Sequence, residues 1–158
     1  MTTNAEKAYE FLKTTVGQDQ GHGEWFELTQ EQIDAFADAT LDHQFIHVDV
    51  ERATAETPFG GTIAHGFLTL SMLVHLSTSI KVDLPPLDGI LMGINYGMNK
   101  VRFINPVPAG SRIRAHAVVS NVELKGNAID TTRTMTVEIE GQDRPALVAE
   151  WIGRMVFA

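Results

Sequence analysis

Two short segments hold the residues whose types and spacing could support chemistry. The first, Asp42-His43-Gln44-Phe45-Ile46-His47, brings a carboxylate and two imidazoles close together along the chain. A carboxylate and a histidine can jointly orient and deprotonate a water molecule, and histidine suits this role because its ordinary pKa is about 6.5. Asp42 and His47 are therefore the candidate acid and base. The alternative is that Asp42 caps the following turn and His47 is a buried structural histidine.

The second segment, Pro58-Phe59-Gly60-Gly61-Thr62-Ile63-Ala64-His65-Gly66, is a glycine-rich turn that runs into a long apolar stretch. Free N–H groups at the start of a helix favour a developing negative charge, and Gly66 has no side chain to hold a ligand away. Together the two segments predict a site for acyl chemistry without a nucleophile. The alternative is that Gly66 only permits close packing of a helix on a sheet.

Other kinds of site have less support in the sequence. His43 and His47 are four residues apart, which is metal-ligand spacing on a helix, but no third ligand is evident beside Asp42 and Asp49, so we predict no metal. The chain has no cysteine, which excludes disulfides, thiolate metal sites and a cysteine nucleophile. It also has no nucleophile elbow, Walker A loop or dinucleotide-binding fingerprint.

Length, composition and charge narrow the class of protein. The chain has 158 residues, of which 44% are hydrophobic, so we expect a single folded domain over residues 1–158. A formal net charge of −8 argues against nucleic acid as a partner, because phosphate binding needs a basic surface. We expect no signal peptide and no membrane span, and the lack of cysteine is consistent with a cytoplasmic location.

The elements that must position these residues can be predicted from periodicity. Helices are expected at Asn4–Val16, from the capping-box pattern at Thr29 to Ala39, and at Ile63–Ile80. The last stretch is apolar on almost every face, which is typical of a central, buried helix. A short strand is expected at Glu24–Leu28 and a helical turn at Val50–Ala55.

After Pro85-Pro86 the chain becomes rich in β-branched residues and predicts a sheet. Four strand candidates follow one another, at Ile90–Val107, Ser111–Leu124, Ala128–Glu140 and Ala146–Phe157. Strands in immediate succession form antiparallel sheets, so we expect an α+β fold in which the sheet curls around the long apolar helix. Basic residues alternate along two of these strands and could either meet phosphate groups or form a solvated face: Lys100, Arg102, Arg112 and Arg114.

These segments resemble a known family, the MaoC-like (R)-specific enoyl-CoA hydratases, also called hydratase 2. The family pattern is roughly Gly-Asp-x-Asn-Pro-Ile/Leu-His, followed by His-Gly at the start of the central helix. Asp42 and His47 match its acid and histidine, and His65-Gly66 matches its His-Gly. The chain departs from the glycine, asparagine and proline of the pattern at Leu41, Gln44 and Phe45, and looks most like the nodulation-protein-N-like branch.

The resemblance implies a hot dog fold and the reversible hydration of trans-2-enoyl-CoA to (R)-3-hydroxyacyl-CoA, without a metal or redox cofactor. It implies that Asp42 and His47 activate a water, that Gln44 positions a reacting group, and that the Gly66 N–H binds the thioester oxygen. It also implies a homodimer or larger homo-oligomer with acyl-CoA along the interface. The candidate substrate-binding residues are His65, in a mainly supporting role, Lys100 and Arg102.

Two other functions remain compatible with the sequence. The first is an acyl-CoA thioesterase, but thioesterases of this fold commonly use a carboxylate on or near the central helix, and none occurs between Thr57 and Lys81. The second is a non-catalytic acyl-CoA-binding protein, which would follow if Leu41 in the glycine position had disabled the loop.

Overall fold

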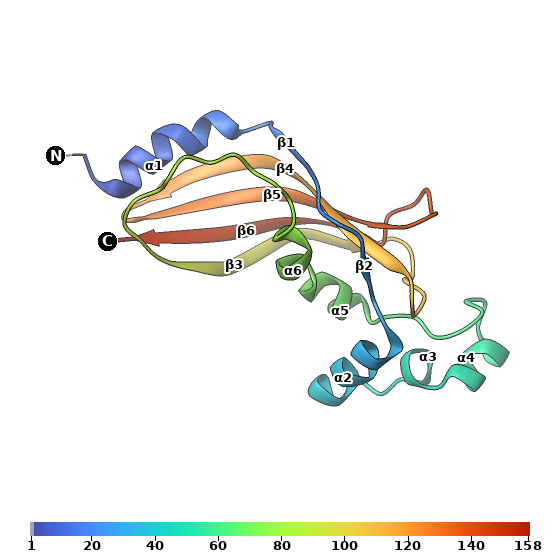
Figure 1. Ribbon diagram of the computed structural model, residues 1–158. Coiled ribbons are helices and arrows are strands. Elements are labelled where there is room, and N and C mark those ends of the chain that lie inside the picture. The colour runs from blue at the N-terminus through green and yellow to red at the C-terminus, as the bar shows by residue number, and fades with distance from the viewer. Residues whose placement is uncertain (1) are drawn as a thin grey trace.

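A curved antiparallel sheet forms the framework of the protein (Figure 1). The computed structural model describes residues 2–158. The sheet runs in the order β1-β4-β5-β6-β3, and β2 pairs with β4 beyond the end of β1. Its strands are β1 (Asp19–His22), β2 (Phe26–Glu27), β3 (Ile90–Phe103), β4 (Arg112–Lys125), β5 (Ala128–Ile139) and β6 (Leu147–Phe157).

The four long strands confirm the prediction from β-branched composition and alternation. Along β4 buried and accessible residues alternate from Ile113 to Val119, so one face of this sheet is apolar and the other is wet. The strand β1 was not predicted, because its sequence Asp-Gln-Gly-His has no apolar alternation. It pairs with β4 through its backbone, around the bulge between Asp19 and Gly21.

The apolar face of the sheet is divided between two groups of helical residues. One half packs against α5 (Gly66–Ser71) and α6 (Leu73–Ser77), and the other half against α1 (Asn4–Leu12), which a 3₁₀ turn at Lys13–Thr15 extends. The sheet therefore wraps around its helices as predicted.

The predicted central helix is shorter and less buried than expected. Instead of one helix over residues 63–80, α5 begins at Gly66 and an irregular turn at Met72 separates it from α6. The residues before Gly66 are extended, because Ile63 bridges to Pro108 and the Ala64 N–H donates to the carbonyl of Val107.

Burial of the helix on every side was also a wrong expectation. Phe67 is 68% exposed and Val74 is 48% exposed, since the sheet covers only one side of the helix pair.

The remaining helices gather beyond α5, at one end of the molecule (Figure 1). They are α2 (Gln30–Thr40), α3 (Phe45–Val48) and α4 (Val50–Glu56). The predicted capping box starts α2: the Gln32 N–H donates to the Thr29 hydroxyl, and the Thr29 N–H donates to the Gln32 side chain. This helix leads directly into the segment that carries Asp42 and His47.

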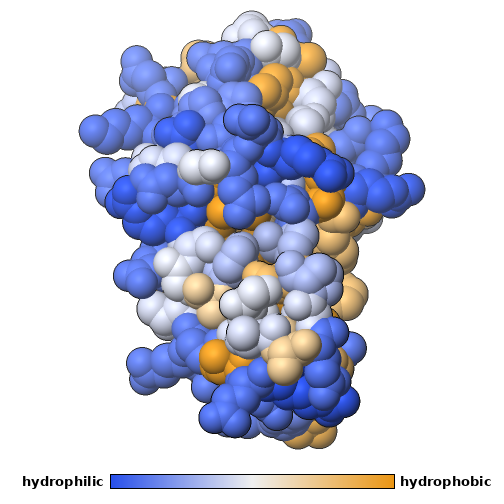
Figure 2. All heavy atoms as spheres, turned by 90° about the vertical axis from the view of Figure 1, so that its right-hand side faces the viewer, coloured by the Kyte–Doolittle hydropathy of each residue, from blue (hydrophilic) through white to orange (hydrophobic). Residues whose placement is uncertain are grey.

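The edge strand β3 is exposed along almost its whole length. Its accessible residues include large apolar side chains, namely Leu91, Met92, Ile94, Tyr96 and Phe103. Viewed from the end where α2–α4 lie, hydrophobic surface is confined to small patches between hydrophilic side chains (Figure 2). No helix within residues 2–158 is long and apolar enough to cross a bilayer.

Candidate active site

The loop that carries Asp42 starts from a left-handed residue. Leu41 ends α2 with φ 64° and ψ 21°, and its side chain is 81% exposed. A residue in this conformation terminates a helix and turns the chain away, a role that usually falls to glycine. Leu41 thus keeps the backbone shape that the family glycine would allow, and the side chain that it adds points into solvent.

His47 is held by hydrogen bonds at both its ring and its backbone. It lies in α3, is buried, and its Nδ1–H donates to the carbonyl of Ile63 at 2.7 Å. The side-chain nitrogen of Gln30 donates to the His47 carbonyl at 2.7 Å, while the Gln30 oxygen accepts from the Thr62 hydroxyl. Because Nδ1 carries the proton, Nε2 of the neutral ring is an unprotonated base.

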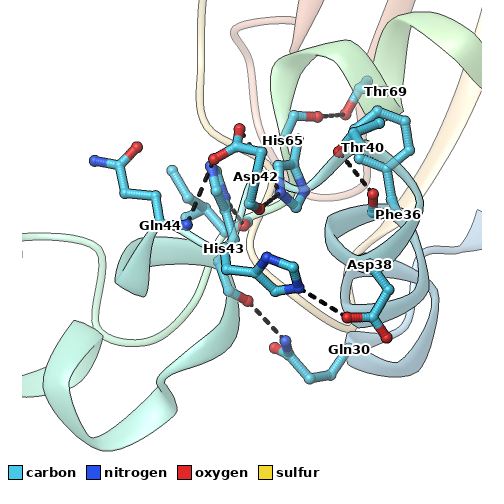
Figure 3. Close-up of polar contacts among 11 residues, drawn as sticks. Gln30, Phe36, Asp38, Thr40, Asp42, His43, Gln44, His65 and Thr69 are labelled. Atoms are coloured by element: carbon cyan, nitrogen blue, oxygen red, sulfur yellow. Dashed lines mark hydrogen bonds and ion pairs between the residues drawn. The ribbon is translucent and has the colours of Figure 1, made fainter.

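His65 stacks on His47, with 3.8 Å between the ring centroids. Its Nε2–H donates to the backbone carbonyl of Asp42 at 2.9 Å, and the Asp42 carboxylate lies 4.0 Å from the same nitrogen (Figure 3). The other nitrogen, Nδ1, is buried and has no hydrogen-bond partner within residues 2–158. His65 therefore ties the Asp42 loop to the start of α5 and packs against one face of the His47 ring.

The environment keeps His47 neutral. Burial lowers the pKa of His47 below its ordinary value of 6.5, and the nearby His65 lowers it further. The hydrogen bond to Ile63 and the charge of Asp42 act in the opposite direction but do not outweigh burial. A histidine with a lowered pKa is in the right protonation state to accept a proton at neutral pH.

Asp42, His47 and His65 converge on one point. One nitrogen of each imidazole and one carboxylate oxygen all lie within 4.8 Å of one another, and this is the one such group among residues 2–158. Two atoms at that separation can share a water molecule at ordinary hydrogen-bond lengths.

A cavity of about 390 Å³ opens beside this group. His47, Gly66, Thr69 and Phe103 contribute to its wall. The Gly66 N–H is the first of α5 and has no acceptor within residues 2–158. A side chain at Gly66 would place its Cβ 3.0 Å from the Phe103 ring, so this position combines close packing with an N–H that has no acceptor, in a residue that lines the cavity.

Gln44 and His43 lie outside this point of convergence. Gln44 is exposed, its side chain extends away from His65 (Figure 3), and its backbone N–H donates to the Asp42 carboxylate at 3.4 Å. His43 pairs with Asp38 at 2.8 Å on the surface, so it is directed away from His47. Gln44 therefore reaches the site through its backbone.

The predicted basic residues differ in whether a carboxylate pairs with them. Lys100 has φ 49°, sits in a bulge of β3, and its ammonium group lies 3.0 Å from Glu150. Arg102 donates to the carbonyl of Val101 and is exposed. Arg112 and Arg114 pair with Glu140 and Glu138 on the wet face of the sheet. Of these residues, Arg102 alone keeps a guanidinium without a carboxylate partner among residues 2–158.

Two contributors to the site were missed by the sequence analysis. The carbonyl of Ile63 fixes the tautomer of His47, and the ring of Phe103 covers Gly66. A backbone carbonyl leaves no signal in side-chain types. Phe103 could have been found only from the bulge at Lys100, which the alternating pattern of the strand does not reveal.

Comparison with known sequences gives a consistent result. A family model described as a MaoC like domain matches residues 11–140. Nodulation protein N of Rhizobium leguminosarum bv. viciae is 52% identical over 142 residues, covering 89% of this chain and 86% of that protein. The 3-hydroxyacyl-thioester dehydratase Z of Mycobacterium tuberculosis H37Rv is 49% identical over 146 residues, covering 92% and 93%.

Solved structures share the fold. A protein described as monoamine oxidase regulatory protein from Archaeoglobus fulgius superposes with a TM-score of 0.73 and 26% identity, covering 90% of this chain and 91% of that one. The R-hydratase PhaJ1 of Pseudomonas aeruginosa, unliganded, gives a TM-score of 0.67 at 20% identity, covering 99% and 87%. At that identity the second likeness shows the fold alone, which is the hot dog fold that the sequence implied.

Proposed function

The chain belongs to the family of MaoC-like dehydratase domains, and from this premise we propose that it adds water reversibly to trans-2-enoyl-CoA, giving (R)-3-hydroxyacyl-CoA. Its membership makes it a hydro-lyase that acts on acyl thioesters. The observation that carries the finer proposal is the convergence of Asp42 and His47 beside the free N–H of Gly66.

In the proposed reaction Asp42 and His47 hold one water molecule. Nε2 of His47 takes a proton from this water while its oxygen attacks C3 of the enoyl thioester. The imidazolium then returns the proton to C2. One H and one OH from a single water therefore add across the double bond, and no other reagent is consumed.

The Gly66 N–H stabilises the charge that develops during this attack. As the oxygen bonds to C3, electron density moves to the thioester oxygen, which becomes enolate-like. A donor already aimed at that oxygen strengthens its bond as the charge grows, and losing one such donor costs about 3–4 kcal/mol in other enzymes. The Phe103 ring packs against Gly66 and helps to keep water away from this oxygen.

The proposal includes pairing of two chains along β3. An edge strand leaves backbone N–H and C=O groups unpaired, and these can pair with a strand of another chain. Proteins usually protect such an edge, above all where it exposes apolar residues. Pairing there would also cover Phe67, which lies exposed beside the cavity and packs edge-on against Phe103 at 5.8 Å. The exposed Arg102 next to this edge is the candidate for contact with the phosphates of CoA.

The test compares two histidines that lie four residues apart. Loss of the enoyl-thioester absorbance is followed with crotonyl-CoA for the parent, Asp42→Asn, His47→Gln and the control His43→Gln. We expect each of the first two variants to lose roughly 100-fold or more in kcat/KM, because each removes a group that holds or deprotonates the water. His43→Gln should keep the activity of the parent, since His43 pairs with Asp38 on the surface.

The other outcomes are equally informative. Folded His47→Gln with unchanged turnover would eliminate His47 as the base. Release of free CoA thiol by the parent would instead indicate a thioesterase. Binding of acyl-CoA without hydration would indicate a non-catalytic binding protein.

A further inference from the structure

A second cavity, of about 320 Å³, lies on the apolar face of the sheet beyond the end of α6. We call it the distal cavity and define it by Leu12, Thr15, Val82, Thr131, Arg133 and Trp151. Its roof is the N-terminal helical segment and the chain that follows α6, and its floor is formed by β3, β4, β5 and β6. The proposed hydration chemistry uses none of these residues.

The distal cavity contains a guanidinium that no carboxylate within residues 2–158 neutralises. Four arginines lie on β4, β5 and β6, and three of them pair with carboxylates. The exception is Arg133, which lies two and four residues before the buried Met135 and Val137 on β5 and so shares their apolar face. Its contact is the ring of Trp151, 4.8 Å from the guanidinium carbon.

Two neutral polar groups beside Arg133 are also unpaired. Oγ1 of Thr131 and Oε1 of Gln20 are buried and have no hydrogen-bond partner within residues 2–158. Both residues line the same cavity as Arg133. Burial lowers the pKa of the Arg133 guanidinium, and no charged neighbour acts on it to raise that pKa again. Buried polar groups are normally paired, so two buried unpaired oxygens beside a half-buried guanidinium without a carboxylate partner indicate a polar ligand.

A further hollow lies along one flank of the helix pair, between the distal cavity and the candidate active site. This hollow, about 260 Å³, lies between Leu70 and Val74 on the helices and Met98 and Trp151 on the strands. It shares Trp151 and Asn95 with the distal cavity. At its other end α5 leads directly back to Phe67 and Gly66 in the wall of the first cavity.

The strand register gives the length of this path. Phe103 at the active site is opposite Leu147 on β6, and Arg133 is opposite Trp151 on the same strand. The two levels are four residues apart, or about 13 Å in an extended strand. An extended chain advances about 1.2 Å per bond, so an acyl chain of roughly ten to twelve carbons covers such a distance.

From this arrangement we propose that the first cavity, the hollow and the distal cavity together bind an enoyl-CoA of medium chain length. The far end of its acyl chain carries a carboxylate, which Arg133 and Thr131 bind in the distal cavity. The inference rests on the proposed hydratase function and adds a substrate class to it. The apolar hollow fits the methylenes of the chain, and the unpaired guanidinium supplies the charge that a carboxylate complements.

The experiment compares two substrates of equal length. kcat/KM is measured with trans-2-decenoyl-CoA and with the ω-carboxylate analogue, the mono-CoA thioester of trans-2-decenedioic acid. The parent should prefer the carboxylate-ended substrate by about tenfold or more, because its guanidinium would otherwise stay unpaired. Arg133→Met should abolish or reverse the preference, Arg133→Lys should keep part of it, and Arg112→Met on the wet face should leave it intact.

A thermal melt without ligand separates a binding role from a structural one. If Arg133 serves to bind a ligand, Arg133→Met removes a half-buried charge that has no carboxylate partner in the free protein, and the melting temperature should stay equal or rise. A lower melting temperature together with an unchanged substrate preference would mean that Arg133 only packs on Trp151, and would overturn the proposal.

The remaining outcomes separate this inference from the function on which it rests. Hydration of both substrates without preference would overturn the carboxylate inference and leave the hydratase function in place. Failure to hydrate crotonyl-CoA and both longer substrates would overturn the hydratase function itself. If free decanedioate raises the melting temperature of the parent but not of Arg133→Met, and the thioesters show no preference, the cavity binds a separate acid, which also overturns the proposal.

Discussion

At the scale of single residues, the site depends on a leucine in a conformation that leucine disfavours. Leu41 has φ 64° and is 81% exposed, so its side chain gains little from burial to offset the strain. A left-handed conformation costs a residue with a Cβ about 1–2 kcal/mol. Glycine at this position would avoid that cost, but it would lose more conformational entropy on folding, which offsets part of the gain.

We therefore predict that Leu41→Gly raises the free energy of unfolding by roughly 0.5–1 kcal/mol and keeps hydration of crotonyl-CoA. Urea denaturation measures the first quantity. Leu41→Ala is the matched control, because it removes the same exposed side chain and keeps the strain, so it should not stabilise. Equal gains in both variants would show that exposed leucine, and not the backbone, is the cause.

The lowered pKa of His47 gives a pH dependence of known sign. The proposed base must be neutral to accept a proton, and burial lowers its pKa below 6.5, so the acid-side decline of kcat/KM should have its midpoint at lower pH than an ordinary histidine would give. A pH–rate profile measures this limb, and an apparent pKa above 6.5 would contradict the assignment.

The same shift acts on stability. The unfolded chain takes up a proton on His47 at higher pH than the folded chain, so this residue should lower the stability as the pH falls through 6.5 and below.

Residue types and spacing identified Asp42 and His47 as neighbours, but they did not predict the contacts that orient the two side chains. The contact between His47 and His65 depends on how α2, α3 and α5 pack, and residues eighteen positions apart have no periodicity that predicts it. The role of each ring nitrogen depends on the carbonyls of Ile63 and Asp42. Such backbone partners are set by the fold and are not encoded in any one motif.

At the scale of elements, the start of α5 combines two demands on one glycine. The sequence left open whether Gly66 serves packing or ligand approach. The structure shows the packing, because the Phe103 ring occupies the space of a Cβ, and Gly66 lines the cavity, so ligand approach stays a prediction. A variant at this position should therefore affect stability and activity together.

We predict that Gly66→Ala lowers the free energy of unfolding by about 1–3 kcal/mol, because the new methyl group overpacks against Phe103. Adding Phe103→Leu should recover part of that loss. The matched control is Gly61→Ala in the same segment, where a Cβ would meet nothing within 4 Å, and it should be nearly neutral. A similar loss in both alanine variants would point to backbone conformation instead of the ring.

The elements themselves were predicted where the pattern of side chains decided them. The four long strands follow from alternation and the first turn of α2 from its capping box. The run from Ile63 to Ile80 was apolar enough for one long helix, but pairing of Ile63 and Ala64 with the 107–108 turn competes with helix formation there. Long-range backbone pairing of this kind cannot be inferred from local periodicity.

At the scale of the whole molecule, the exposed edge β3 is the surface that the proposed dimer would use. Leu91 is 62% exposed and Tyr96 is 54% exposed on this strand. Lysine on an edge strand opposes pairing with a second strand. We predict that Leu91→Lys combined with Tyr96→Lys shifts the mass measured by light scattering after gel filtration from dimer to monomer.

Val16→Lys is the matched control for this pair. Val16 is an exposed apolar residue, 48% accessible, in the segment after α1 and away from β3, so its replacement should leave the mass unchanged. A parent protein that elutes as a monomer at all concentrations would remove the basis for pairing along β3.

The exposure of Phe67 and Phe103 beside the first cavity has a consequence for how the enzyme must be assayed. If a second chain covers Phe67 and Phe103 in the dimer, the fraction of covered cavities depends on protein concentration. Dilution below the dissociation constant of the dimer then opens the cavity to water. Turnover per chain would then fall as enzyme is diluted and recover when acyl-CoA links the two halves. A progress curve started from concentrated stock would slow with the time constant of subunit dissociation, a hysteresis that resembles inactivation and reverses on concentration.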